Sequence, residues 1–169
     1  GKNGDAAMAS VTPDLVYIEN GAPVAVSDNI TVSDADFITD AYIDSARVAF
    51  AYGMMSGDWL GLAPGSITAN STALNAAYNA SSGVLTITGH GSMAQWQTAL
   101  REVSFSSSSH EPSASSPSAE TRVIMFAVWD GIAESAYVYR NVMVTPVNDA
   151  PVLADSQNDT LLYTENAAP

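Results

Sequence analysis

The stretch Tyr17-Ile18-Glu19-Asn20-Gly21-Ala22-Pro23 occurs a second time at the end of the chain, as Tyr163-Thr164-Glu165-Asn166-Ala167-Ala168-Pro169. The two copies share the pattern Tyr-x-Glu-Asn-x-Ala-Pro, lie 146 positions apart, and each follow two aliphatic residues. Such a match is hard to produce by chance in 169 residues. It indicates one complete repeat and the first strand of the next, taken from a tandem array in which each unit contacts its neighbours.

The position of the repeat sets the expected domain boundaries. We expect a linker or cloning remnant at 1–10, one β-sandwich repeat at 11–151, and a linker with the first strand of the next repeat at 152–169. A chain of 169 residues is long enough for one domain with its own core, and it needs no second domain.

The composition is strongly acidic and free of cysteine. Five basic residues against 18 acidic ones give a formal charge of −13, which argues against nucleic-acid partners and anionic membranes. Without cysteine, neither disulfides nor thiolate metal sites hold the fold, so carboxylates and carbonyls are the available ligands, and they suit calcium. The apolar runs are too short for a membrane helix, so we expect no membrane insertion in this segment.

Several segments show the alternation or β-branched enrichment that is typical of strands. Residues 46–52 place apolar side chains on one face, 84–88 bury Leu85 and Ile87, and 121–129 are apolar on both faces, as in a central strand. The other predicted strands are 24–32, which carries the β-branched run 30–32, and 137–147.

Glycine-rich and serine-rich segments separate these strands. We predict a long connection at 53–65 with Trp59 packed inward, and an end to the strand at Gly89 and Gly91. A surface loop is expected at 106–119.

One helix is expected to begin at Ser92. The spacing of Ser92 and Gln95 is that of a capping box, in which each side chain bonds to the backbone of the other residue. A single helical stripe follows, formed by Trp96, Ala99, Leu100 and Val103. Many short strands and one short helix predict an all-β fold, an antiparallel β-sandwich of the Ig-like or cadherin-like Greek-key type.

Four segments of the chain together resemble a cadherin-like tandem repeat of large bacterial surface adhesins, of the RTX or biofilm type. In chain order they are Glu19-Asn20, Asp34-Ala35-Asp36, Ala127-Val128-Trp129-Asp130-Gly131 and Val147-Asn148-Asp149-Ala150-Pro151. The Asp-Arg-Glu ligand motif of that family has no counterpart, because Leu100-Arg101-Glu102 lies in the predicted helix.

The resemblance implies that calcium binds where neighbouring repeats meet. Glu19 and the exit linker would lie toward the downstream junction, whereas Asp34 and Asp36 would face the upstream one. Calcium accepts six to eight oxygen ligands at flexible geometry, which carboxylates spaced two apart in a loop can supply. Asp130 is also a candidate ligand, although a turn former is the stronger interpretation of an aspartate before Gly131. The candidate metal ligands are Glu19, Asp34, Asp36, Asn148, Asp149 and Asp130.

Such a repeat would act as a calcium-stiffened extender in cell adhesion or biofilm formation, outside the cell or on the bacterial surface. Its first partners would be the neighbouring repeats of the same chain. The alternative is a ligand-binding domain within an adhesin. It would bind a glycan or a peptide, on a host or cell-surface glycan or protein, through the 53–65 loop with Trp59 or the loop around His110.

An enzyme is the third class of function. The chain has no Gly-x-Ser-x-Gly elbow and no His-x-x-x-His pair, and His90 between two glycines is expected to be a turn residue. We therefore expect no catalysis.

Overall fold

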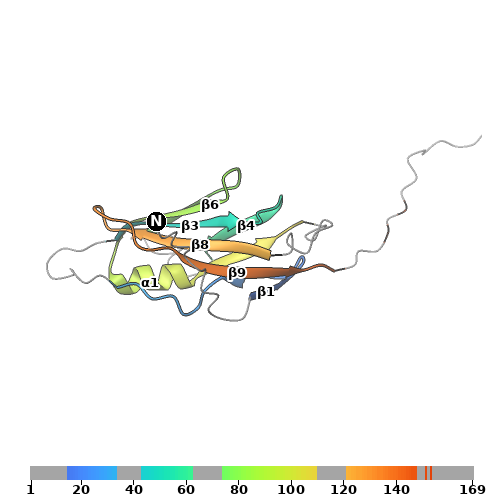
Figure 1. Cartoon of the computed structure of the whole chain (residues 1–169), viewed down its shortest axis with the longest axis horizontal. Helices are drawn as coiled ribbons and strands as arrows, with labels where there is room; N and C mark the ends of the chain where they lie inside the picture. The colour runs from blue at the N-terminus through green and yellow to red at the C-terminus, as the bar shows by residue number, and fades with distance from the viewer. Residues whose placement is uncertain are drawn as a thin grey trace, which may run out of the picture.

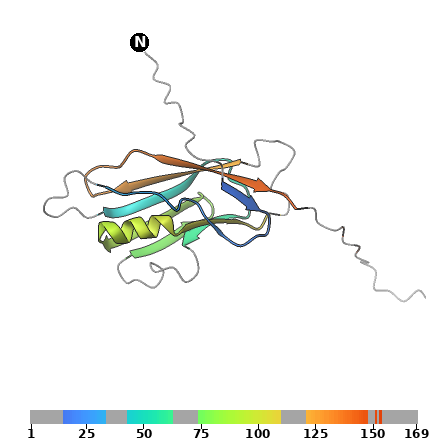
Figure 2. The ribbon, with the colours of Figure 1, turned by 90° about the horizontal axis from the view of Figure 1, so that it is seen from below.

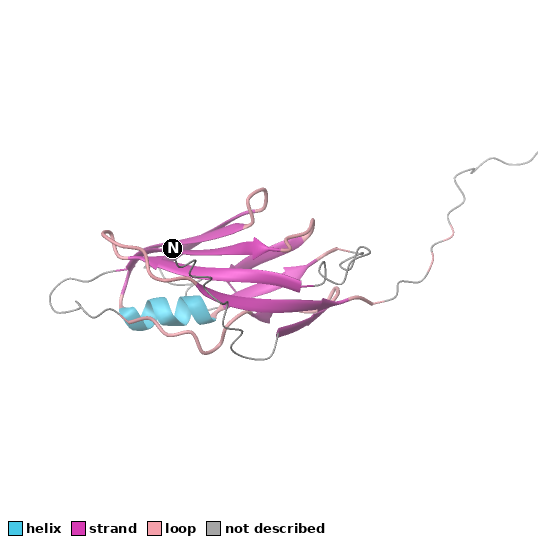
Figure 3. Ribbon diagram, viewed as in Figure 1, coloured by secondary structure: helices cyan, strands magenta, loops and turns pink. Residues whose placement is uncertain are grey.

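The protein is described from a computed structural model, which covers residues 15–33, 43–62, 74–109, 121–147, 151 and 153. Within these residues the strands form two packed sheets with one helix (Figures 1 and 3). The larger sheet has the order β1 (Leu15–Ile18), β9 (Val138–Thr145), β8 (Thr121–Trp129), β3 (Ile43–Tyr52), β6 (Val84–Gly91) and β5 (Leu74–Asn79). The smaller has the order β2 (Val24–Ala25), β7 (Val103–Ser107) and β4 (Asp58–Leu62). The all-β sandwich predicted from the sequence is confirmed.

The strand pairings are antiparallel except for β1 and β9, which run parallel from Leu15 opposite Val142 to Ile18 opposite Thr145. The two strands lie near opposite ends of the described chain, yet they lie side by side in the fold (Figure 1). This pairing brings the first copy of the repeated motif next to the segment that leaves the domain.

The core is formed by side chains from both sheets and from the helix. Phe105 of β7 is its aromatic centre, with Tyr17 at 5.1 Å and Phe50 at 6.1 Å between ring centroids, both edge to face. Aromatic pairs prefer this arrangement, because the positive edge of one ring meets the negative face of the other. Strand β8 lies between β9 and β3, as predicted for a strand that is apolar on both faces.

Helix α1 (Met93–Arg101) begins as the sequence predicts (Figure 2). The Gln95 N–H donates to the Ser92 hydroxyl, and the Ser92 N–H donates to the Gln95 side chain at 2.8 Å, which completes the capping box. Trp96, Ala99 and Leu100 are buried on one stripe. Val103 is also buried, but it belongs to β7 rather than to the helix.

Three expectations about local structure are wrong. Of the strand expected within 24–32, only β2 forms, and residues 30–32 lie outside it, because the Ile30 carbonyl accepts from the Arg101 guanidinium at 2.9 Å instead of pairing in a sheet. The predicted connection at 53–65 contains strand β4. Strand β6 continues through Gly89 and His90, because the glycine, at φ 135°, lies where the register with β3 shifts and so accommodates a bulge rather than an end.

Candidate metal site

In the first copy of the repeated motif, Tyr17, Glu19 and Asn20 have different structural roles. Tyr17 is 1% exposed, and its hydroxyl donates to the Gly21 carbonyl at 2.9 Å and lies 3.1 Å from the Ser107 carbonyl of the other sheet. Asn20 turns the chain after β1 with φ 57°, a left-handed conformation that asparagine tolerates better than most residues. Glu19 lies between Tyr17, which packs in the core, and Asn20, which forms the turn.

Glu19 is held against the segment that follows β9. Its backbone N–H donates to the Thr145 carbonyl at 3.0 Å, and its Oε2 accepts from the Val147 N–H at 2.8 Å. The residue is 3% exposed. The predicted proximity of Glu19 to the exit from the domain is thus present in the fold, since Val147 immediately precedes Asn148-Asp149.

The second oxygen of the same carboxyl group is different. Oε1 of Glu19 is buried and has no hydrogen-bond partner among the described residues. A buried acceptor that is left unsatisfied costs about 1–3 kcal/mol, and more when the group is charged. Chemically, the arrangement offers a fixed carboxyl oxygen to a donor or a cation at the exit of the domain.

Four of the six candidate ligands, Asp34, Asp36, Asn148 and Asp149, lie outside the described residues. Within the described part of the chain, no three acidic or histidine side chains come together as a metal-binding group. Glu19 is therefore the candidate ligand whose surroundings at the domain exit can be specified.

Asp130 acts as a turn former. Its Oδ1 accepts from the Ile132 N–H at 2.8 Å and from the Ala133 N–H at 2.7 Å, in the turn after β8. It lies at the end of the sandwich opposite to Glu19, because β8 and β9 are antiparallel and Phe126, near Asp130, pairs with Val138 at the start of β9. It cannot share an ion with Glu19 in one domain.

The hydrogen bonds from two backbone N–H groups lower the pKa of Asp130. The N–H of Ala133 has the larger effect and that of Ile132 the next. A carboxyl group with a lowered pKa in the folded state stabilises the fold above its ordinary pKa, near 3.9, and this contribution is lost as the pH falls through the lowered value. We therefore expect Asp130→Ala to lower the melting temperature at pH 7, and to lower it less at pH 2.5. Thermal unfolding at the two pH values measures this. An equal loss at both would mean that the charge plays no part in the turn.

A buried ion pair between the sheets was not predicted from the sequence. Asp58 begins β4 and Arg122 lies on β8, and the Arg122 Nε donates to the Asp58 Oδ2 at 2.8 Å with both side chains fully buried. The same oxygen accepts from the Met55 N–H at 2.8 Å. Asp58, for which the sequence favours a turn former over a metal ligand, is a structural link between the two sheets.

Trp59 also differs from the expectation. It was predicted to pack inward, but it is 38% exposed, because the alternation of β4 turns Asp58 and Leu60 toward the core and Trp59 away from it. Trp96, by contrast, is fully buried. Of the two histidines, His90 lies in β6 and His110 lies outside the described residues.

No protein-family model, curated protein or solved structure matches this chain. The helix that the structure describes is too short to cross a membrane, and the described residues hold no other candidate span.

Proposed function

We propose that this chain is a calcium-binding, cadherin-like repeat of a large secreted or cell-surface bacterial adhesin. It would act as an extender in cell adhesion or biofilm formation, and calcium would stiffen its junctions with neighbouring repeats. The observation that carries the proposal is the carboxyl group of Glu19, which is buried at the exit of the domain with one oxygen anchored and the other without a partner.

This geometry fits a hard cation. Calcium binds carboxylate, amide and carbonyl oxygens, and the residues that follow Val147 are Asn148 and Asp149, which carry such oxygens. Glu19 would hold the ion together with these two side chains, and the ion would offset the charge of the carboxylates gathered there. The Val147 N–H fixes the direction of the Glu19 carboxyl group, so that its Oε1 is placed before any ion arrives.

The position of Glu19 and the chain order of the other predicted ligands support junction sites rather than a site inside the domain. Glu19 lies at one end of the sandwich, whereas 34–42, which contains the predicted upstream ligands Asp34 and Asp36, directly precedes the start of β3. β3 starts beside Trp129, which precedes Asp130 at the opposite end from Glu19. A string of such units would therefore carry ligands at both ends of each unit, and neighbours would complete each other's sites.

The test is thermal unfolding of the chain in a chelator, in millimolar calcium and in millimolar magnesium. A ligand that binds only the folded state at about 100 times its Kd adds about 2.7 kcal/mol, which corresponds to roughly 5–10 °C for a domain of this size. We expect a rise with calcium that magnesium does not reproduce. Equal melting temperatures in all three conditions would contradict calcium binding by this repeat.

A further inference from the structure

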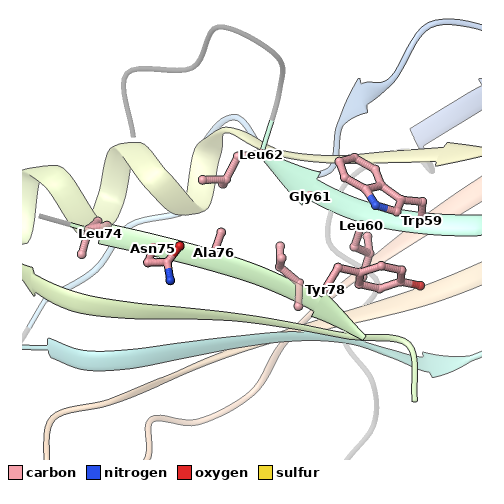
Figure 4. Close-up of a pocket in the computed structure, with 9 residues that line it drawn as sticks. Trp59, Leu60, Gly61, Leu62, Leu74, Asn75, Ala76 and Tyr78 are labelled. Atoms are coloured by element: carbon pink, nitrogen blue, oxygen red, sulfur yellow. The ribbon is translucent and has the colours of Figure 1, made fainter. Parts of the chain in front are cut away.

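The sandwich is open along one side, where the last strand of each sheet faces the other. Strand β4 ends the smaller sheet and β5 ends the larger one, so each has an edge that pairs with no strand among the described residues. A cavity of about 310 Å³ lies between them (Figure 4). Its walls include Trp59, Gly61 and Leu62 of β4, and Leu74, Asn75 and Tyr78 of β5.

Trp59 is held in a fixed position at this cavity. Its ring lies over Gly61, so closely that a Cβ built on the glycine would lie 1.9 Å from the ring. Tyr78 meets the indole edge to face at 6.2 Å, and its own hydroxyl donates to the Asp58 carbonyl at 3.1 Å. Burial, and secondarily the charge of Asp58, raise the pKa of Tyr78, so this hydroxyl keeps its proton at neutral pH. An exposed aromatic ring supported in this way loses little conformational freedom when a ligand binds.

Among the described residues, no charged side chain lines the cavity, although the chain has a formal charge of −13. The lining combines two aromatic rings with a floor of aliphatic side chains. We propose that this groove binds a neutral sugar, with one pyranose ring stacked on Trp59.

The chemistry of a pyranose matches the lining of the groove. One face of the ring presents C–H groups that pack on an aromatic surface, while the hydroxyls around its rim need donors and acceptors. The backbone edges of β4 and β5, which pair with no strand among the described residues, supply both. The acidity of the chain disfavours sialylated and sulfated sugars through charge repulsion. An extended peptide is the other ligand that an open strand edge accepts. A peptide strand, however, needs an unobstructed strand edge to pair with, whereas the rings of Trp59 and Tyr78 lie against each other at this groove.

This site goes beyond the proposed calcium role and does not depend on it. The described residues that line the groove include none from the segment around Glu19 or from 138–147. Sugar binding should therefore be the same in chelator and in calcium, so that each of the two proposals can fail while the other holds.

The test begins with the full chain on a printed array of neutral oligosaccharides ending in glucose, galactose or N-acetylglucosamine, with sialylated glycans and a random peptide array beside it. The strongest neutral ligand is then titrated by calorimetry. We expect Trp59→Ala to weaken binding about tenfold or more, as truncation of an aromatic anchor does. Trp129→Ala is the matched control, because Trp129 is 40% exposed and does not line the groove. It should bind like the wild type.

A milder variant guards against a misfolded Trp59→Ala. Gly61→Val displaces the indole while leaving it in the chain. It should weaken binding while near-wild-type melting is retained. The proposal is overturned if no neutral glycan binds, if only sialylated glycans or peptides bind, or if the bound glycan tolerates Trp59→Ala and Gly61→Val as well as it tolerates Trp129→Ala.

Discussion

Asp58→Ala is expected to destabilise the fold by about 3–5 kcal/mol, the range found when one partner of a buried ion pair is removed. The reason is that Arg122 keeps its charge in the core after the carboxylate is gone, and the Met55 N–H loses its acceptor. For a domain of this size the loss corresponds to roughly 6–20 °C in melting temperature. Thermal unfolding or a urea titration measures it directly.

Two further variants separate the charge pair from the packing. Asp28→Asn is the control, because Asp28 is exposed, and it should change stability by less than about 0.5 kcal/mol. The double variant Asp58→Leu/Arg122→Met removes both charges, and it should recover much of the lost stability, since buried pairs are often replaceable by apolar residues. If Asp58→Ala costs no more than Asp28→Asn, the pair does not hold the sheets together.

The second large effect concerns calcium. Glu19→Gln is expected to remove most of the calcium-dependent stabilisation, about 2.7 kcal/mol at 100 times the wild-type Kd. Glutamine keeps the shape of the side chain and an oxygen that can accept from the Val147 N–H, but it lacks the charge that a divalent cation requires. In chelator, the variant should melt close to the wild type or above it, because the buried charge is gone.

The measurement is a calcium titration followed by thermal unfolding. Glu134→Gln makes the same chemical change at an exposed residue. Glu134 lies at the opposite end of the sandwich, where its backbone forms an isolated antiparallel β-bridge with Trp129. It should keep the full calcium response. An unchanged calcium response in Glu19→Gln would mean that the ion binds elsewhere. An equal loss of the response in Glu134→Gln would mean that the effect depends on net charge alone.

The strands that could be predicted from the sequence are those whose side chains alternate or are apolar throughout. Strand β3 shows a clear two-residue period and β8 is apolar on both faces, and each lies within the larger sheet. Helix α1 was predictable from its cap, since Ser92 and Gln95 interact across only three residues. In these elements, local sequence and tertiary contacts favour the same structure.

Strand β4 could not be predicted, because contacts distant in sequence determine it. Its first residue, Asp58, is charged, and the core tolerates this carboxylate because it pairs with Arg122, 64 positions later in the sequence. Gly61 looks like a turn residue in the sequence, whereas in the fold it makes room for the Trp59 ring. The expectation that Trp59 packs inward was wrong for the same reason, because the two-residue alternation of a strand was not predicted at 58–62.

The candidate site was predictable in part, through the repeated motif. The repeat made Glu19 a residue of interest, and the resemblance to a cadherin-like repeat implied that it lies with the exit linker, where the contact with Val147 is found. The buried, unpartnered Oε1 could not be foreseen, because burial at the end of β1 depends on how β9 packs beside it.

The central claim is that calcium stiffens the junction between neighbouring repeats, and small-angle X-ray scattering from a tandem protein of two copies tests it most directly. We predict a longer and fixed maximum dimension in calcium, and a shorter average with a broad distance distribution in chelator, because the junction carboxylates then repel one another and the angle between repeats is free. The same tandem with Glu19→Gln in the first copy should behave in calcium as the wild type does in chelator. Identical scattering curves with and without calcium would contradict the claim.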